Sequence, residues 1–321
     1  MTDHVGHGVM PSRRIGIDVG GTKAQGVAID RDGSVVATAH RLTPRGEGSL
    51  EPLVEVLADL AGELDHDASV GVGVPGLVTR TGVLRAAPNL DGVADLEIAR
   101  LLSERLGVAV AVDNDATCAT VAEWRLGAGV GIDDLILVTL GTGIGGGMVA
   151  DGVLHRGVNG FAGEFGHMVI DPDGPRCPCG RRGCWERYAS GSGLAMLARD
   201  AATGHRLRDV VRRAGGDPQS VRGEHVQLAA RDGDPEAPAV IDDFARWVAL
   251  GLSNLTNAFD PAMFVLGGGL AAASDLYLGP ITRWFTELLY QPQLRPVPAI
   301  AFARWGPLAG AIGAALLPEL A

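Results

Sequence analysis

Arg14-Ile-Gly-Ile-Asp-Val-Gly-Gly-Thr-Lys23 has the pattern of a short apolar strand that runs into a glycine-rich turn. An extended pattern resumes over residues 24–29, and Asp32-Gly33 predicts a hairpin turn into a third strand. The same layout returns between Leu135 and His155, where Gly141-Thr-Gly-Ile-Gly-Gly-Gly147 is the first turn. The chain therefore contains an internal repeat of strand, glycine and threonine turn, strand, Asp-Gly turn and strand.

The segments after each copy of the repeat predict an α/β architecture. Helices are predicted over residues 50–64, 95–106, 194–203, 225–231, 235–259 and 308–317, and strands over residues 70–74, 108–112 and 263–266. A duplicated β/α unit with a glycine turn in each half predicts two lobes around a central cleft, with a nucleotide between the turns. The expected domains are a small N-terminal lobe at 14–112, completed by a C-terminal helix at 308–321, and a large C-terminal lobe at 113–307.

The glycine turns have the composition of a phosphate-binding site. Glycine lets backbone N–H groups approach an anion closely, and Asp18 is suited to orient the water shell of Mg²⁺. Neither turn is a Walker loop, and the run Gly141-x-Gly143-x-x-Gly146 is followed by a strand where the dinucleotide fingerprint needs a helix. An ordinary turn is the alternative for the first copy alone, but the repetition favours a nucleotide site. The residues predicted to bind the nucleotide and its Mg²⁺ are Asp18, Gly20, Gly21, Thr22, Lys23, Gly141, Thr142, Gly143, Gly267, Gly268 and Gly269.

A different motif places four metal-binding side chains within eighteen residues. His167, Cys177, Cys179 and Cys184 supply one imidazole and three thiols, which is the donor set of a tetrahedral structural zinc site. The alternative is four ordinary buried or free side chains, but three of the four cysteines fall within eight residues. An ion with four protein ligands has no open position for water, so it would shape the loop 164–186 and leave the chemistry to other residues.

Acidic and amide side chains complete the candidate site. Asp113-Asn114-Asp115 follows a predicted strand and precedes a predicted helix, so Asn114 or Asp113 is alternatively only a helix N-cap. Phosphoryl transfer to an alcohol needs a carboxylate beside the attacking hydroxyl, which makes Asp115 the candidate base and Asn114 a candidate ligand of the acceptor. Asn89 is either a ligand contact or a turn former. Glu164 and Glu186 flank the zinc motif and are either ligands of a hydroxyl-rich molecule or solvated loop charges.

Composition excludes several classes of partner. The chain has 321 residues, 46% of them hydrophobic, which is enough for a substantial core in two domains. A formal net charge of -11 without a Lys/Arg run argues against nucleic acid and anionic membranes as partners. No apolar run reaches the roughly 18 residues of a membrane span, and residues 1–13 have the polar composition of a disordered leader. Four cysteines, three of them in metal-like spacing, favour a reducing cytoplasm over a disulfide framework.

Taken together, these motifs resemble the ROK family of sugar kinases, and within it the bacterial glucokinases. The resemblance extends from Ile15 to Leu317 and is carried by Asp18-Val-Gly-Gly-Thr-Lys23, Gly73-Val-Pro-Gly76, Asn114-Asp115, Leu140-Gly-Thr-Gly-Ile-Gly-Gly-Gly147, Glu164-Phe-Gly-His167, Cys177 to Glu186 and Leu266-Gly-Gly-Gly-Leu270. It implies a duplicated actin-like ATPase (ribonuclease H-like) fold, Mg·ATP as phosphoryl donor, a sugar 6-phosphate as product, and a homodimer or homotetramer. Family members that accept polyphosphate tend to lack the zinc signature, so its presence favours ATP.

The resemblance also implies roles for individual residues. Asp115 would be the catalytic base, and His167 would place one ring nitrogen on zinc and the other on the sugar. The sugar would be held by Gly76, Asn89, Asn114, Asp115, Glu164, His167 and Glu186. Glucose is the expected acceptor, and the alternatives are a kinase for N-acetylmannosamine, N-acetylglucosamine or fructose, or a non-catalytic ROK sugar sensor. ROK repressors carry an N-terminal helix-turn-helix domain, which thirteen leader residues cannot contain, so a DNA-binding repressor is disfavoured.

Overall fold

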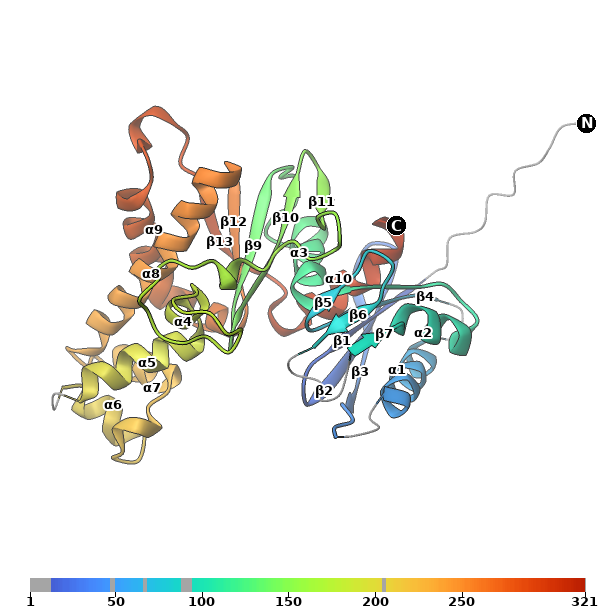
Figure 1. Cartoon of the computed structure of the whole chain (residues 1–321), viewed down its shortest axis with the longest axis horizontal. Coiled ribbons are helices and arrows are strands. Elements are labelled where there is room, and N and C mark those ends of the chain that lie inside the picture. Colours follow the sequence, from blue (N-terminus) through green and yellow to red (C-terminus); the bar gives the residue numbers. More distant parts are fainter. Residues whose placement is uncertain (1–12, 47–49, 66–67, 88–93, 204–205, 321) are drawn as a thin grey trace, which may run out of the picture. The chain divides into compact units, whose positions relative to one another are not determined.

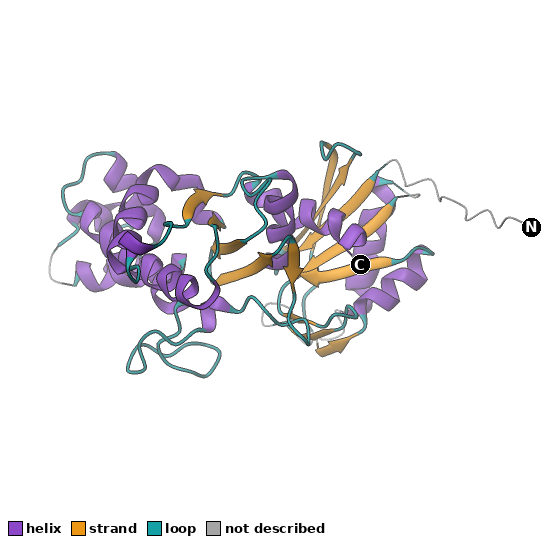
Figure 2. Cartoon of the chain, turned by 90° about the horizontal axis from the view of Figure 1, so that it is seen from above, coloured by secondary structure: helices purple, strands orange, loops and turns teal. Residues whose placement is uncertain are grey.

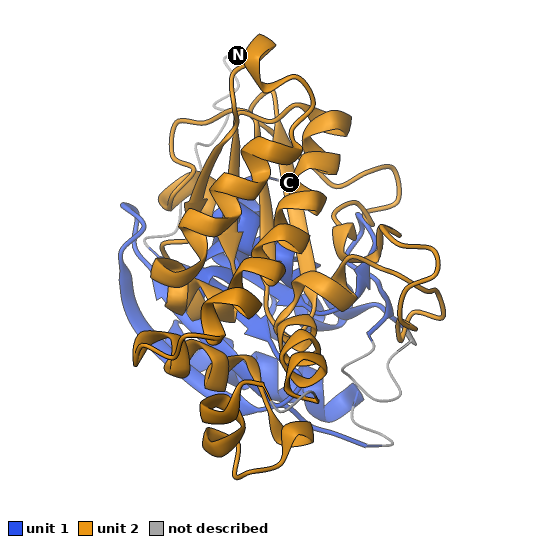
Figure 3. Cartoon of the chain, turned by 90° about the vertical axis from the view of Figure 1, so that its left-hand side faces the viewer, with its two compact units in different colours: residues 1–122, 308–321 blue, residues 123–307 orange. Residues whose placement is uncertain are grey.

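The computed structural model describes residues 13–46, 50–65, 68–87, 94–203 and 206–320 (Figure 1). Two compact units make up the chain: unit 1 is residues 1–122 with 308–321, and unit 2 is residues 123–307 (Figure 3). The predicted leader, apart from Arg13, and Asn89 lie outside the described residues. The units divide after residue 122, and not after residue 112 as predicted, because the first part of the intervening helix packs in unit 1. At Gly313 of unit 1 an added Cβ would lie only 1.6 Å from the carbonyl oxygen of Cys118.

Unit 1 is built on a five-stranded sheet in the order β3-β2-β1-β4-β8. Its strands are β1 (Arg14–Val19), β2 (Lys23–Ile29), β3 (Val35–Leu42), β4 (Ser69–Val74) and β8 (Val110–Asn114). The first three pair antiparallel, whereas β4 is parallel to both β1 and β8. A small sheet of β5 (Leu77–Val78), β6 (Leu84–Ala86) and β7 (Ala94–Leu96) lies between β4 and β8 in the sequence.

Helices cover both faces of this sheet because successive side chains of a strand point to opposite faces. The helices of unit 1 are α1 (Leu50–Leu64), α2 (Ile98–Leu106), α10 (Ala309–Leu316) and the start of α3 (Asp115–Leu126). Ile15 and Ile17 of β1 share a buried core with α1 and α2. Gly16 faces α10, and a Cβ there would lie 1.8 Å from the carbonyl oxygen of Ala311. Glycine is therefore required for α10 to pack directly on the strand.

Unit 2 repeats the strand arrangement of unit 1 in the order β11-β10-β9-β12-β13. Its strands are β9 (Leu135–Leu140), β10 (Ile144–Ala150), β11 (Val153–His155), β12 (Met263–Gly267) and β13 (Ala299–Phe302). Again the first three strands pair antiparallel and the next two run parallel to the first. Asp151 and Gly152 both have positive φ, as a tight hairpin turn requires. The internal repeat predicted from the sequence is confirmed.

Figure 2 shows the helices of unit 2 in purple, and all of them except the remainder of α3 share a large hydrophobic core with β9 and β12. They are α4 (Glu186–Ala189), α5 (Gly191–Ala202), α6 (Arg208–Arg213), α7 (Gly223–Arg231), α8 (Ala237–Phe259), α9 (Ser274–Leu288) and the remainder of α3. Single-turn 3₁₀ helices lie in the loops at Phe165–His167, Pro218–Ser220, Gly269–Ala273 and Pro292–Leu294 in unit 2, and at Gly306–Leu308 and Leu317–Leu320 near the C-terminus. Among the described helices, none has the length and apolar character needed to cross a membrane.

Two predicted elements differ from the structure. The helix expected over 95–106 begins only at Ile98, because residues 94–96 pair as strand β7 and Asp95 has a left-handed φ of 52°. The strand expected over 108–112 is instead Val110–Asn114, so Asp113 and Asn114 belong to the sheet. Helix α9 and strand β13 were not predicted.

A buried carboxylate ties together the two segments of unit 2 that lead to unit 1. Glu123 has no exposed surface. One carboxylate oxygen accepts the backbone N–H of Trp305 at 2.8 Å, and the other accepts those of Arg304 at 3.0 Å and Ala128 at 2.9 Å. An added Cβ on Gly127 would lie 2.1 Å from this carboxylate, so the neighbouring loop needs glycine there.

Candidate active site and metal centre

The candidate residues of unit 1 gather at one edge of its sheet. Strands β1, β4 and β8 are parallel, so their carboxyl ends lie side by side. The register pairs Asp18 with Gly73 and Gly73 with Asp113, which places the ends of all three strands in one row. Gly76 follows β4, and Asp115 follows β8. The structure therefore brings together the predicted base, the predicted Mg²⁺-orienting carboxylate and two predicted sugar contacts.

Asn114 joins two of these strand ends. Its side-chain oxygen accepts the backbone N–H groups of Ala116 at 2.8 Å and Thr117 at 3.1 Å, and its amide nitrogen donates to the carbonyl oxygen of Gly76 at 3.1 Å. Asn114 therefore caps the N-terminus of α3, and its role as a ligand of the acceptor stays a prediction. An amide nitrogen carries two hydrogens, so one hydrogen bond to Gly76 does not use all its donors. Gly76 has a φ of 104°, and a Cβ there would lie 2.0 Å from the carbonyl oxygen of Ala86.

The two candidate carboxylates of unit 1, Asp18 and Asp115, interact electrostatically. Asp115 opens α3 and accepts the N–H of Ala116 at 2.9 Å. Burial, and then the charge of Asp115, raise the pKa of Asp18 to about 7. The carboxyl carbon of Asp18 would lie 2.6 Å from a Cβ on Gly310, which is in the first turn of α10. A cation near Asp18 would favour its ionised form and reverse the direction of this pKa shift.

The second and third glycine runs of the sequence meet in unit 2. Gly267 of β12 pairs with Thr139 of β9, so the two strands end together. Gly268 has a φ of 81°, and a Cβ there would lie 2.7 Å from the Leu140 backbone. Gly269 begins a 3₁₀ turn. Gly143 closes the other turn by accepting the N–H of Gly141 at 3.0 Å.

The start of α5 adds residues that the sequence analysis missed. The N–H of Gly191 donates to the carbonyl oxygen of Gly141 at 2.7 Å, and the hydroxyl of Ser192 donates to that of Thr142 at 2.9 Å. The signal was the run Ser190-Gly191-Ser192-Gly193, whose small residues allow a helix to begin against a turn. The N-terminus of a helix beside the Gly141–Gly143 turn favours an anion there.

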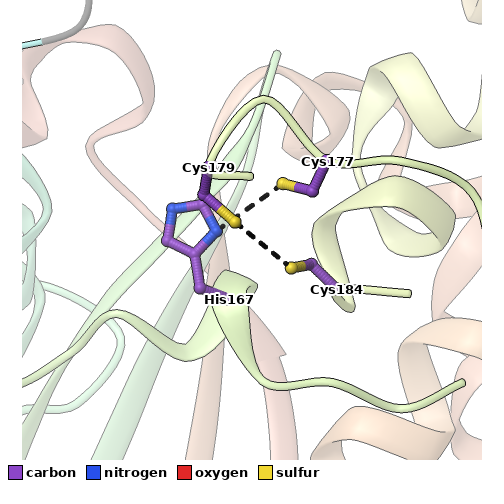
Figure 4. Close-up of side chains that lie close together, drawn as sticks. All are labelled: His167, Cys177, Cys179 and Cys184. Atoms are coloured by element: carbon purple, nitrogen blue, oxygen red, sulfur yellow. Dashed lines mark hydrogen bonds between the residues drawn. The ribbon is translucent and has the colours of Figure 1, made fainter. Parts of the chain in front are cut away.

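His167, Cys177, Cys179 and Cys184 converge from the loop and a 3₁₀ turn, as predicted for a metal site (Figure 4). Their ligand atoms all lie within 4.8 Å of one another. The Sγ of Cys177 is 3.9 Å from Nδ1 of His167, and the Sγ atoms of Cys179 and Cys184 are 3.5 Å apart. Ligands around a tetrahedral zinc ion with bonds of about 2.0–2.3 Å are roughly 3.4–3.8 Å apart, so these four donors fit zinc with small adjustments.

The surroundings of the three thiols shift their pKa values in different directions. Burial raises the pKa of Cys184 to about 12 and also raises that of Cys177. The backbone N–H of Arg181 lowers the pKa of Cys179. Zinc binds thiolates, so its binding would release protons from the buried thiols. None of the four cysteines in the chain forms a disulfide.

Tight turns and the side chain of Trp185 fix the loop 164–186 to the core of unit 2. Gly183 has a φ of 64°, and a Cβ there would lie 1.5 Å from the carbonyl oxygen of Asp171. Trp185 is fully buried and donates its indole N–H to the carbonyl oxygen of Trp247 at 2.8 Å. Its ring would lie 1.9 Å from a Cβ on Gly251, so the ring can pack against α8 only because residue 251 is a glycine. The next residue along the chain is Glu186.

Three predicted sugar contacts, Glu164, His167 and Glu186, belong to the loop 164–186. Nδ1 of His167 faces the thiols, and Nε2 lies 3.8 Å from the carboxylate of Glu164. Burial raises the pKa of Glu164, with a smaller rise from Glu186 and an opposing effect of His167. Glu186 accepts the backbone N–H of Ile144 at 3.0 Å. An imidazole nitrogen and two carboxylates are thus grouped beside the metal ligands.

Comparison with known proteins identifies the family. The model of the ROK family matches residues 14–319. The chain belongs to the ROK family. This ROK protein is 38% identical over 307 residues to a glucokinase of Streptomyces coelicolor, with 94% of this chain and 96% of the relative covered. It is also 31% identical over 307 residues to an N-acetylmannosamine kinase of Escherichia coli, with 95% and 98% covered.

A solved structure agrees with this membership. The ROK family glucokinase of Streptomyces griseus, in complex with glucose and AMPPNP, superposes with a TM-score of 0.84 at 36% identity. The match covers 96% of this chain and 99% of that chain. The predicted actin-like ATPase fold of this ROK protein is confirmed. The individual roles predicted for Asp115, the sugar contacts and the phosphate turns stay predictions.

Proposed function

We propose that this ROK protein is an ATP-dependent glucokinase that transfers the γ-phosphoryl group of Mg·ATP to the 6-hydroxyl of glucose. The observation that carries the proposal is the near-full-length similarity to the two Streptomyces glucokinases, one of them solved with glucose and an ATP analogue. The grouping of His167, Glu164 and Glu186 beside the metal ligands supports it, since such groups suit a hydroxyl-rich ligand.

The sugar is bound by hydrogen bonds to its hydroxyl groups. In unit 2, Nε2 of His167 and the carboxylates of Glu164 and Glu186 serve this purpose, while Nδ1 of His167 faces the thiols. In unit 1 the contacts come from Gly76, Asn89, Asn114 and Asp115. His167 and the three cysteines would hold a zinc ion, which would stiffen this loop and leave the chemistry to other residues.

Asp115 accepts the proton of the attacking hydroxyl. The hydrogen bond from the N–H of Ala116 fixes the orientation of its carboxylate at the start of α3. A base held in this way leaves the hydroxyl oxygen free to attack phosphorus in line with the leaving group. No covalent enzyme intermediate is required.

The glycine turns bind the phosphates of the nucleotide. Backbone N–H groups at Gly20–Lys23, Gly141–Gly143 and Gly267–Gly269 contact the phosphate oxygens, together with the side chains of Thr22, Lys23 and Thr142. Magnesium bound with ATP supplies charge neutralisation at the β- and γ-phosphates, and Asp18 orients its water shell.

The proposal is tested by measuring ADP release from Mg·ATP by the purified chain over a panel of hexoses. Glucose should give the highest kcat/KM and yield glucose 6-phosphate. A higher value with N-acetylmannosamine, N-acetylglucosamine or fructose would reassign the sugar, and the likeness to an N-acetylmannosamine kinase makes that sugar the most informative competitor. Binding of sugar without ADP release would indicate a sensor. Polyphosphate in place of ATP should give no product.

Two further properties belong to the same proposal. Thiol ligands must stay reduced, which is consistent with a cytoplasmic enzyme that feeds glucose into glycolysis. The family resemblance also predicts a homodimer or homotetramer, which the mass of the native protein in solution would establish.

A further inference from the structure

The segment that follows β3 holds the first glycine turn by its carbonyl groups. The hydroxyl of Thr43 donates to the carbonyl oxygen of Gly20 at 2.7 Å, and its backbone N–H donates to that of Thr22 at 3.1 Å. The Nε–H of Arg45 donates to the carbonyl oxygen of Gly21 at 2.8 Å. Three successive carbonyl groups of the turn therefore point toward residues 43–45.

The direction of the carbonyl groups fixes the direction of the N–H groups. No described peptide bond is cis. In a planar trans peptide, the C=O of one residue and the N–H of the next point in opposite directions. The N–H groups of Gly21, Thr22 and Lys23 consequently point away from residues 43–45. Within the described part of the chain, those of Gly21 and Thr22 have no hydrogen-bond acceptor.

Successive N–H groups turned to one side form a concave anion site, called a nest. A hydrogen bond from the N–H of Gly20 to the carbonyl oxygen of Lys23 at 2.9 Å closes the turn, and the carbonyl groups of Gly20, Gly21 and Thr22 keep their direction through an external constraint. Thr43 is suited to provide it, because it is only 5% exposed and a buried hydroxyl holds its hydrogen bond firmly. Arg45 is exposed and brings a positive charge to the turn at Gly21 in a chain of net charge -11.

We propose that Thr43 and Arg45 are positioning residues that hold the Gly20–Lys23 turn in the conformation that binds the phosphates of ATP. The proposal rests on the proposed kinase function and goes beyond it, since neither residue contacts the nucleotide through the hydrogen bonds that define its role. Thr43 fixes both ends of the turn, and Arg45 fixes its middle. The constraint acts before ATP arrives, so it lowers the ordering cost of binding.

The central experiment compares Thr43→Val, which removes the hydroxyl and keeps the shape, with Thr43→Ser, which keeps the hydroxyl. Thr43→Val should raise the KM for Mg·ATP by about 3–10-fold, the effect of one hydrogen bond, with the glucose KM unchanged. Thr43→Ser should stay near the wild-type value. Thr38→Val is the matched control, because Thr38 is an exposed residue of β3, the strand that leads to Thr43.

Arg45 allows a second test that does not disturb a buried position. Arg45→Ala removes the guanidinium, and Arg45→Lys keeps the positive charge but lacks the Nε–H on a rigid guanidinium. Both variants should therefore raise the KM for Mg·ATP. Binding of AMPPNP, measured by calorimetry in the absence of glucose, should weaken in the same order as the KM rises. Wild-type behaviour of Arg45→Lys would overturn the orienting role of Arg45.

Three other outcomes would overturn the role of Thr43. These are an unchanged ATP KM in Thr43→Val, equal losses in Thr43→Val and Thr43→Ser, and parallel rises in the ATP and glucose KM values. The last would indicate a general folding defect, which thermal unfolding of the same samples would reveal. Failure of the kinase proposal is recognised separately, since the wild-type chain would then release no ADP with any hexose.

Discussion

The carboxylate of Glu186 accepts the backbone N–H of Ile144 at 3.0 Å and lies against Gly143, where an added Cβ would be 2.4 Å from one of its oxygens. A predicted sugar contact is therefore hydrogen-bonded to the residue that follows a predicted phosphate turn. The two sites share a structural element within unit 2, so a change in the turn should be felt at the sugar as well as at the nucleotide.

Substitution at Gly143 tests this relationship. Gly143→Ala should raise the glucose KM as well as the ATP KM, because the methyl group would displace the Glu186 carboxylate. Gly141→Ala is the matched control, since its Cβ would meet no atom closer than 3.9 Å, and it should leave the glucose KM unchanged. Steady-state kinetics with each substrate varied in turn would measure both constants. An effect of Gly143→Ala on ATP alone would contradict the coupling.

Replacement of the proposed base should affect turnover more than binding. Asp115→Asn keeps an oxygen that can accept the N–H of Ala116, so the start of α3 should be preserved. We expect kcat to fall by about 10²–10⁴-fold, the usual contribution of a positioned general base, while the KM values for glucose and ATP change little. Glucose affinity measured by calorimetry serves as the control. A variant with near-normal kcat would remove Asp115 from the mechanism.

The raised pKa of Asp18 predicts a pH dependence near neutrality. Burial, followed by the charge of Asp115, raises this pKa to about 7, so the carboxyl group is protonated below that pH in the metal-free protein. If Asp18 orients the Mg²⁺ water shell as an anion, the apparent affinity for Mg²⁺ should increase as the pH rises through about 7 and level off above it. Titrations of Mg²⁺ against activity at fixed ATP would measure this.

The raised pKa of Asp18 also predicts that the stability of the metal-free protein falls with rising pH, whereas its affinity for Mg²⁺ rises. A carboxyl group with a raised pKa binds its proton more tightly in the folded than in the unfolded state, so its contribution falls as the pH rises from about 4 to about 7. Asp18→Asn should remove this fall.

Asp115→Asn should move the midpoint of the Mg²⁺ dependence to lower pH, because it removes the second cause of the rise in the pKa of Asp18. An unmoved midpoint would show that the two carboxylates do not interact.

Loss of the metal should weaken sugar binding more than ATP binding. Cys179→Ser or treatment with a chelator should raise the glucose KM or abolish activity, because His167, Glu164 and Glu186 then lie on an unconstrained loop. Elemental analysis should find about one zinc per wild-type chain, from the four-ligand count. Cys118→Ala, in α3 of unit 1, is a thiol control that should keep its zinc. A metal-free wild-type protein with full activity would refute the structural role.

Truncation of Glu123 should destabilise the fold. Glu123→Ala leaves three backbone N–H groups without their buried acceptor, so we expect a loss of about 2–5 kcal/mol in the free energy of unfolding. Glu123→Gln retains one acceptor oxygen and should lose less. Urea denaturation of both variants would measure the difference. Equal stability of Glu123→Ala and the wild type would mean that water replaces the carboxylate.

The sequence was most informative where the interacting residues are close together along the chain. The four candidate zinc ligands lie within eighteen residues, so their spacing alone predicted a cluster that the structure confirms. The repeated glycine turns likewise predicted two equivalent sheets. Local patterns failed at Asp95, which has a left-handed backbone and lies within strand β7, in a stretch with helical spacing.

Contacts between distant segments could not be predicted from local patterns. The hydrogen bonds from Thr43 and Arg45 to the first glycine turn depend on the register of β2 and β3, which no single segment encodes. The same holds for Glu123 and the loop before α10, about 180 residues later in the sequence. Helix α9 was missed because it contains Pro280, a residue that normally argues against a helix interior.

The placement of α10 has a consequence for the order in which the protein folds during its synthesis. This helix is buried along its whole length and packs directly on Gly16 and Gly71, where a larger residue would collide with its backbone. The ribosome nevertheless makes it only after all of unit 2. At about 5–20 residues per second, the interval between the two parts of unit 1 is roughly 10–40 s. Unit 2 is continuous in sequence and can fold within that time. Nascent unit 1 must meanwhile keep an apolar sheet face uncovered, which makes it the part of the chain that a chaperone would bind.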